Sequence, residues 1–239
     1  MGARLFTAYF MRHPQTTQNV GGENLDERTP LTERGWEQAE HIFEFIERER
    51  IQHVICSPAD RTFGVLMEKR RSDIPVSVSP LFREWSRADK LREFQKEGVS
   101  KDDSRIKAIK LNRILNFGPD FNPLPGEEGW GDVLGIMNGG LKFVRDIALE
   151  HDPPLERLLV LTHRHRALMY KAFISAGMKA MDDPMLRILG THPLLFPELF
   201  KLMDANYRFD NTDYLEFYYG QLYGKETSGW SIDIGKKIC

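Results

Sequence analysis

The sequence is poor in cysteine and has no long hydrophobic run. Its 239 residues include two cysteines, Cys56 and Cys239, which are too few for a disulfide framework and lack CxxC or zinc-type spacing. Such usage is typical of a reducing compartment. The first apolar stretch is interrupted by Arg4 and Arg12, so it is too short for a signal peptide or a membrane span. We therefore expect a soluble cytoplasmic protein without a membrane partner.

The chain also lacks an excess of charge of either sign. Its 33 lysines and arginines and 35 aspartates and glutamates leave a net charge of −2 with histidine neutral. No global field therefore attracts nucleic acid, and binding of any anion has to be local. Repeats and low-complexity segments are absent, and the length suits one domain, residues 1–239, with or without an insertion.

Short apolar runs alternate with segments of helical periodicity. Residues 5–11, 53–56 and 157–162 predict buried strands, and residues 212–220 and 230–234 predict further strands, one of them antiparallel at an edge. Helices are expected at residues 60–69, 133–150 and 166–176, and also after Thr32, where an apolar stripe recurs at steps of three and four: Trp36, Ala39, Phe43 and Ile46. The alternation predicts an α/β fold, with a mostly parallel, mixed sheet between helices in a Rossmann-like three-layer arrangement.

Residues 81–130 break this alternation and predict a helical insertion over the carboxyl edge of the sheet. The segment is rich in basic residues and ends in a turn-rich stretch. Charge runs on helices usually form solvated faces, and the alternative is that they face a binding pocket. The basic residues are Arg83, Arg87, Lys90, Arg92, Lys96, Lys101, Arg105, Lys107, Lys110 and Arg113.

Three of the predicted strands end in residues suited to phosphate. The first ends in Arg12-His13, the second in Ser57-Pro58 with Arg61 within one turn, and the third in His163. In an open α/β sheet the ligand site lies beyond the carboxyl ends of the strands, so these endings are expected to converge. Guanidinium groups offer planar forks of donors to phosphate oxygens, and an imidazole can donate to them or attack phosphorus.

An ordered set of motifs resembles the histidine phosphatase superfamily, the phosphoglycerate-mutase-like fold. RHPQTTQN (12–19) resembles its RHGxTxxN signature, and the other matching stretches follow in the family's order along nearly the whole chain. These stretches are LTERGWEQA (31–39), CSPADRT (56–62), LFREW (81–85), PGEEGWGDV (125–133), LLVLTH (158–163) and DNTDYLEF (210–217).

The resemblance implies a role for each matching residue. His13 is expected to be the nucleophile that becomes a phosphohistidine, and Arg12, Arg61 and His163 are expected to bind the phosphoryl oxygens. Glu84 is expected to protonate the leaving oxygen and then to accept a proton from the attacking water. Asn19 is expected to add a neutral donor, and Thr16 of the same motif is also expected to bind substrate. Arg164, which does not match the family pattern, is expected to bind substrate as an additional cation.

This chemistry is mainly positioning and electrostatic stabilisation of a loose transition state, so it requires no metal and no other cofactor. A general acid contributes about 10²- to 10⁴-fold, and a pKa raised by partial burial would help Glu84 in this role near neutral pH. Glu127 and Glu128 are alternative candidates for the general acid. Glu84 would then only form an ion pair with Arg83 or Arg87.

The chain departs from the family pattern at two places. Pro14 replaces the glycine after the first histidine, and Arg164-His165 replaces the Gly-Gly after the second. The two side chains either crowd the approach of backbone amides to phosphate or enlarge the cationic pocket for a substrate with a second anionic group. An H-x-H pair also suggests a metal, but no carboxylate or cysteine follows at a recognised ligand spacing.

Three functions follow from these observations. The first is a hydrolase for a small phosphorylated substrate or a phosphopeptide. The second is a phosphomutase, which is disfavoured because Trp85-Ser86-Arg87-Ala88 differs from the E-R-x-Y-G-like stretch of those enzymes. The third is a non-catalytic module that binds a phosphorylated partner. Retention of both histidines favours the hydrolase, because a binding module has no need of His13 as well as His163.

Overall fold

The computed structural model describes residues 4–20, 29–68, 73–85, 89–100, 102–182, 194–206, 208–221 and 228–232. They form two compact units. The first unit lies within Met1–Glu84, Gly139–Ala167 and Arg208–Cys239, and the second within Trp85–Asn138 and Leu168–Tyr207. The second unit therefore contains most of the predicted insertion but also a later part of the chain. One domain with an insertion at residues 81–130, over the carboxyl edge of the sheet, stays a prediction.

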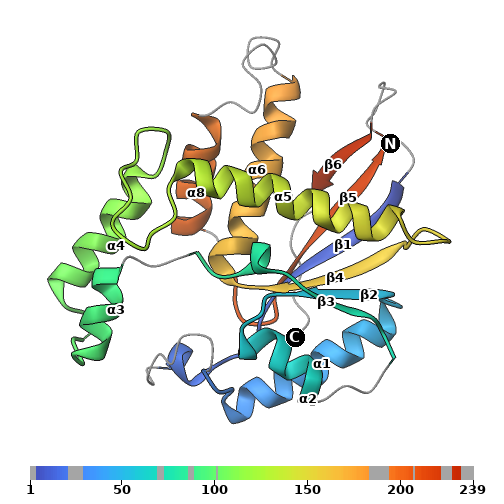
Figure 1. Ribbon diagram of the computed structural model, residues 1–239, viewed down its shortest axis with the longest axis horizontal. Coiled ribbons are helices and arrows are strands. Elements are labelled where there is room, and N and C mark those ends of the chain that lie inside the picture. Colours follow the sequence, from blue (N-terminus) through green and yellow to red (C-terminus); the bar gives the residue numbers. More distant parts are fainter. Residues whose placement is uncertain are drawn as a thin grey trace. The chain divides into compact units, whose positions relative to one another are not determined.

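The first unit is built on a six-stranded sheet (Figure 1). The strands are β1 (Arg4–Arg12), β2 (His53–Cys56), β3 (Val76–Val78), β4 (Arg157–Thr162), β5 (Tyr214–Gln221) and β6 (Ser228–Ile232), in the order β3-β2-β4-β1-β5-β6. The first four are parallel, whereas β5 is antiparallel to β1 and β6 is antiparallel to β5. The predicted α/β fold with a mixed sheet is confirmed, but two strands are antiparallel where one was expected.

Apolar side chains cover both faces of this sheet. On one face, β1, β2 and β4 pack against α1 (Glu33–Arg48) and α2 (Val65–Glu68) in a buried cluster that includes Met11, Phe45 and Leu159. On the other face, Phe10 contacts Phe82, which in turn contacts Phe143 of α5 (Trp130–Leu149). Figure 1 shows α1 and α2 on the side of the sheet opposite to α5. Because both faces of the sheet are buried, the parallel strands consist of continuous runs of apolar residues.

Helix α1 forms as predicted and is fixed at its start. Thr32 is the N-cap, and its hydroxyl accepts a hydrogen bond from the amide of Gly35 at 2.9 Å. Trp36, which belongs to the predicted stripe, is only half-buried. Ile42 and Phe45, which were not part of that stripe, are buried. Gly35 has no room for a side chain, because a Cβ there would lie 2.0 Å from the backbone oxygen of Gln15. Helix α1 therefore sets the path of the loop that follows β1.

The remaining predictions differ from the structure mainly at short elements. The helix expected at residues 60–69 starts as a π-helical turn, Asp60–Gly64, and continues as α2. Helix α6 (Arg164–Asp182) begins two residues earlier than expected. Strand β3 and helix α8 (Leu195–Asn206) were missed, β3 because it has three residues beside Pro75. Helix α8 carried a usable signal in the spacing of its buried Phe196, Leu199 and Phe200.

The second unit contains α3 (Asp89–Lys96), α4 (Ser104–Asn116) and α8. Leu91 and Phe94 of α3 pack with Ile106 of α4, and a separate cluster of aromatic rings lies between the end of α4 and α8. Phe117 lies at its centre, with ring centroids 4.7 Å from Trp85 and 5.9 Å from Phe200. The basic residues described on α3 and α4 are exposed apart from Arg113, which confirms a solvated face. Arg87 and Lys101 lie outside the described residues. None of the helices that the structure describes has the length and hydropathy to span a membrane.

Replacing Gly35 with alanine should destabilise the first unit by about 1–3 kcal/mol, because the new methyl group meets backbone that cannot rotate away. Gly135→Ala in α5 is the matched control, since nothing lies within 4 Å of its would-be Cβ and alanine is the better helix former. Urea denaturation would measure both variants. Equal unfolding midpoints for the two would contradict the close approach of α1 to Gln15.

Candidate active site

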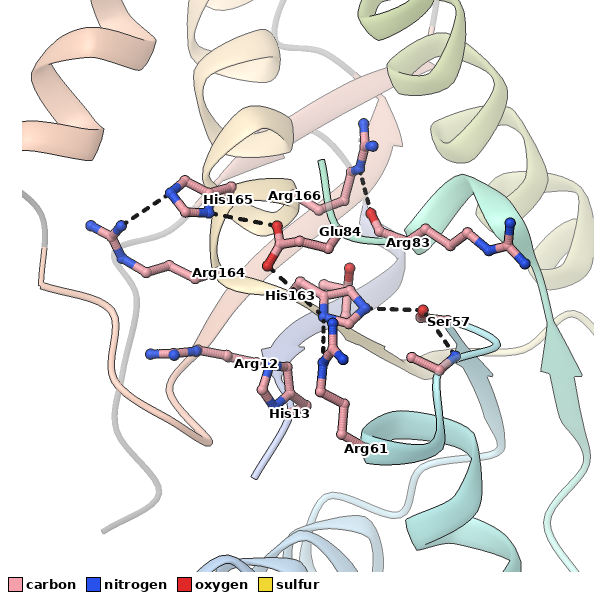
Figure 2. Close-up of polar contacts among 12 residues, drawn as sticks. Arg12, His13, Ser57, Arg61, Arg83, Glu84, His163, Arg164, His165 and Arg166 are labelled. Atoms are coloured by element: carbon pink, nitrogen blue, oxygen red, sulfur yellow. Dashed lines mark hydrogen bonds and ion pairs between the residues drawn. The ribbon is translucent and has the colours of Figure 1, made fainter. Parts of the chain in front are cut away.

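Three parallel strands deliver the site residues to one edge of the sheet. Strand β4 lies between β1 and β2 and is parallel to both. Hydrogen bonds continue past the strand ends, from the His13 amide to the Thr162 carbonyl at 3.0 Å and from the Ser57 amide to the Leu161 carbonyl at 3.1 Å. The predicted convergence of the three strand endings is therefore confirmed, and Figure 2 shows the side chains that meet there.

His13 is buried in a single tautomer. The residue is 4% exposed, and its Nδ1 lies 2.7 Å from the carbonyl oxygen of Pro14. A carbonyl can only accept, so Nδ1 carries the proton and Nε2 keeps its lone pair. Burial comes first, then the charge that His163 carries when it is protonated, and then the charges of Arg61 and Arg12; together they hold the pKa of His13 well below its usual value. The ring is therefore neutral near pH 7, with an unprotonated nitrogen.

His163 lies beside His13 and is also neutral. The two ring centroids are 5.1 Å apart. Arg61 Nε donates to His163 Nδ1 at 3.3 Å, so the proton lies on Nε2, which donates to Ser57 Oγ at 3.0 Å. Burial, opposed by Glu84 and assisted by Arg61, Arg166 and Arg12, lowers the pKa of His163 to about 3. Arg61 therefore sets the tautomer of His163, and Ser57 accepts the resulting Nε2 proton. The position of Ser57 directly after a strand was the signal available in the sequence.

Arg12 has a hydrogen-bond donor left over. Its Nη1 donates to the Phe209 carbonyl at 2.8 Å, but among the residues that the structure describes its buried Nε meets no acceptor. A buried donor without an acceptor costs about 1–3 kcal/mol, which a bound anion would recover. Burial is the main cause of the lowered pKa of Arg12, which the charge of Arg164 lowers further.

Glu84 faces both histidines that follow β4. Its carboxylate is 24% exposed, with Oε2 at 4.0 Å from His163 Nδ1 and Oε1 at 3.6 Å from His165 Nδ1. Burial is the largest single influence and raises the pKa, but the His165 contact, a positive charge on His165 or His163 when protonated, and the charge of Arg61 together outweigh it. The pKa of Glu84 is therefore well below its usual value. The expectation of a raised pKa was wrong for this state, because the sequence did not show how many cations surround the carboxylate.

Two hydrogen bonds from β4 and α6 hold the segment that carries Glu84. Thr162 Oγ1 donates to the Phe82 carbonyl at 2.7 Å, and Arg166 Nε donates to the Arg83 carbonyl at 2.7 Å. Arg166 is fully buried, and sequence analysis missed it because an arginine in a helix usually lies on the surface. The side chain of Arg83 points away from Glu84 (Figure 2).

Glu127, an alternative candidate for the general acid, has different neighbours from Glu84. Glu127 belongs to the second unit, where Oε1 lies 3.6 Å from Arg113 Nε and Oε2 accepts from the Leu124 amide at 3.2 Å. Glu127 therefore has a structural partner there, whereas Glu84 lies beside His163. Arg87, the other partner considered for Glu84, lies outside the described residues.

Asn19 and Thr16 organise the loop after His13. Asn19 Oδ1 accepts from the Thr16 amide at 2.9 Å and from the Thr16 hydroxyl at 3.1 Å, and it lies 3.3 Å from Asn211 Nδ2. Asn211 also donates to the His13 carbonyl at 2.9 Å. Thr16 is fully buried, so in this structure its hydroxyl serves the loop. Substrate binding by either residue stays a prediction.

Arg164 and His165, the departures from the family pattern, also face the site. Arg164 Nη1 lies 3.4 Å from His165 Nε2, so the two residues and Glu84 form a chain of contacts (Figure 2). The side chains thus lie beside the predicted acid. Substrate binding by Arg164 stays a prediction.

A polar cavity opens next to the loop after β1. Its volume is about 250 Å³, and it borders the site through Asn211, which contacts the His13 carbonyl. The cavity is lined by Gln15, Arg34, Gln38, Arg208, Asp210, Asn211, Thr212 and Asp213.

Taken together, the site is strongly cationic while both of its buried histidines are neutral. Arg12, Arg61, Arg164 and Arg166 lie around the carboxylate of Glu84 (Figure 2), and Asp210 and Asp213 lie within electrostatic range of Arg12. Such a set is suited to a dianion such as a phosphoryl group. Among the described residues, histidine, cysteine, aspartate and glutamate nowhere gather in a group of three or more that could hold a metal ion.

The sequence matches a family model. The model of the histidine phosphatase superfamily (branch 1) matches residues 8–165. This range includes Arg12, His13, Arg61, Glu84 and His163. No curated protein sequence gives a significant match.

Several solved structures share the fold at low sequence identity. A mycobacterial glucosyl-3-phosphoglycerate phosphatase is 17% identical, with a TM-score of 0.59 over 96% of this chain and 97% of that protein. The alpha-ribazole phosphatase of Shigella flexneri is 17% identical, with a TM-score of 0.53 over 95% of each chain. A protein called mycobacterial hydrolase 1 is 18% identical, with a TM-score of 0.59 over 97% of this chain and 98% of that protein. The mycobacterial phosphatase is also known in complexes with VO3 and with inorganic phosphate.

The lowered pKa values of the buried histidines should make the protein less stable in acid. Below pH 6.5 the unfolded histidines bind protons that the folded ones do not, so stability falls with pH, for His163 until about pH 3. His163→Gln keeps a donor for Ser57 but removes one titrating group. Urea denaturation between pH 6.5 and 4.5 should therefore give a slope smaller by up to about 1.4 kcal/mol per pH unit in the variant. Parallel curves for the two proteins would contradict a neutral, buried His163.

Proposed function

Since the chain belongs to the histidine phosphatase superfamily, we propose that it hydrolyses a phosphate monoester through a phosphohistidine on His13. The observation that carries the proposal is the state of His13. The ring is buried and neutral, Nδ1 is engaged by the Pro14 carbonyl, and Nε2 keeps its lone pair. Pro14 is compatible with this proposal, because the contact uses its carbonyl rather than the amide proton that proline lacks.

In the first step, Nε2 of His13 attacks phosphorus while the bond between phosphorus and the ester oxygen breaks. Glu84 gives its proton to the leaving oxygen. The carboxylate is ionised in the free site, but a phosphate dianion nearby would raise its pKa, since like charges disfavour ionisation. A monoanionic ester would itself bring the proton that Glu84 needs.

In the second step, Glu84 takes a proton from water. The water oxygen attacks phosphorus, the bond to His13 Nε2 breaks, and inorganic phosphate leaves. Two displacements at phosphorus thus replace one harder displacement by water.

The guanidinium groups would stabilise the phosphoryl group in both steps. Arg12 would direct its buried Nε toward a phosphoryl oxygen, and Arg61 is placed beside both rings. The neutral His163 adds no charge that would repel the nucleophile when it becomes cationic. Preorganised donors of this kind supply much of the catalysis in phosphoryl transfer.

A small phosphorylated molecule is the favoured substrate. The names of two structural neighbours describe phosphatases of small molecules, and the polar cavity beside His13 could hold a hydrophilic leaving group. A phosphopeptide remains the alternative. Location in the cytoplasm stays a prediction from the use of cysteine.

His13→Ala should lower phosphatase activity by at least roughly 10³-fold, because the phosphoenzyme can no longer form. The activity of both proteins is measured as release of phosphate from 4-nitrophenyl phosphate, with and without EDTA. EDTA should leave the activity of the intact protein unchanged. His151→Ala is the control, since that histidine is exposed and contacts Pro153. No turnover, together with binding of vanadate, would favour the non-catalytic module over the hydrolase.

Glu84→Gln should distinguish substrates by their leaving groups. For an alkyl phosphate, whose leaving oxygen needs a proton, the rate should fall about 10²- to 10⁴-fold. For 4-nitrophenyl phosphate, whose leaving group departs unprotonated, the loss should be much smaller. Rates for a series of phosphate esters would give the dependence on the pKa of the leaving group. An equal loss for every ester would exclude Glu84 as the acid.

A further inference from the structure

His165 lies between a cation and the predicted acid. It is the second residue of α6, its side chain is 29% exposed, and its two ring nitrogens have different neighbours. Nε2 lies 3.4 Å from Arg164 Nη1, and Nδ1 lies 3.6 Å from Glu84 Oε1. Figure 2 shows the three side chains in a row, with His165 in the middle.

The contact with Arg164 determines which nitrogen of a neutral His165 carries the proton. A guanidinium has donors only, so Nε2 has to accept, and the proton lies on Nδ1. That proton is directed to the carboxylate of Glu84. The distance of 3.6 Å is longer than a direct hydrogen bond, but such contacts often tighten when substrate binds.

We propose that His165, held by Arg164, is a positioning residue that orients the Glu84 carboxylate through Nδ1. The inference rests on the proposed function. The backbone before Glu84 is fixed by Thr162 and Arg166, but these bonds do not fix the rotation of its side chain. His165 supplies a directed contact at one carboxylate oxygen and leaves the other toward His163.

The charges around Glu84 agree with this role. Burial is the largest single influence on its pKa and raises it, but the contact with His165, a positive charge on His165 or His163, and the charge of Arg61 together hold it well below its usual value; Arg12 also lies within electrostatic range. His163 is neutral near pH 7 because its own pKa is about 3. The Nδ1 proton of His165, directed at Oε1, therefore stabilises the ionised carboxylate between catalytic cycles. The two side chains that replace glycines thus act on the acid rather than merely crowding the site.

Three substitutions of His165 separate this role from simple packing. His165→Asn places an amide N–H near the position of Nδ1, His165→Gln places one near Nε2, and His165→Ala provides neither. If His165 orients Glu84, the asparagine variant should retain most activity toward an alkyl phosphate. The glutamine and alanine variants should lose roughly 10-fold, with much smaller losses on 4-nitrophenyl phosphate. The loss should appear in kcat rather than in KM.

A second readout does not depend on turnover. Carbon-13 NMR titration of the Glu84 carboxyl carbon, assigned with Glu84→Gln, should show a pKa that is higher in His165→Ala than in the intact protein and restored toward it in His165→Asn. An unchanged Glu84 pKa in His165→Ala would overturn the proposal. So would a rise in KM alone, which would assign Arg164 and His165 to a second anionic group of the substrate. If the intact protein has no activity but the pKa shifts as described, the proposed reaction fails while the contact is upheld.

Discussion

Two buried histidine rings have to remain uncharged beside a group of arginines, and the rest of the site depends on this constraint. With ring centroids 5.1 Å apart, both rings lose protons because burial and the neighbouring cations make a charged imidazole costly. Each ring nitrogen then has a defined state, set by the Pro14 carbonyl for His13 and by the Arg61 guanidinium for His163, whose Nε2 donates to Ser57. Neutrality near pH 7 provides a nucleophile and leaves the positive charge on the arginines.

The fold meets this constraint with rigid elements. Parallel strands β1, β2 and β4 end side by side, so their following residues come together without a long loop. Thr162 and Arg166 hold the backbone that carries Glu84. Fully buried Arg166 thus contributes both a hydrogen bond and a charge. Stability and the proposed chemistry use the same contacts, which explains why acid should weaken the fold and the site together.

The low pKa of Glu84 changes how its role has to be understood. In the free protein the surrounding cations keep the carboxylate ionised, whereas the proposed first step needs a proton on it. The incoming phosphoryl group supplies the missing negative charge, so the carboxylate would accept a proton only when there is a substrate to receive it. His165 and Arg164, which are unusual for the family, lie at this carboxylate, so the departures from the pattern bear on the acid.

The sequence by itself determined the α/β class, the principal strands and α1, because apolar periodicity and capping are local properties. It also indicated the strand endings at Arg12-His13, Ser57 and His163, because the carboxyl ends of parallel strands share an edge. Only the tertiary structure decided the ring tautomers, the low pKa of Glu84, the burial of Arg166 and the place of His165. Each of these depends on groups far apart in the chain, such as Arg61 and His163, and electrostatic effects in a buried site are set by distances that no local pattern encodes.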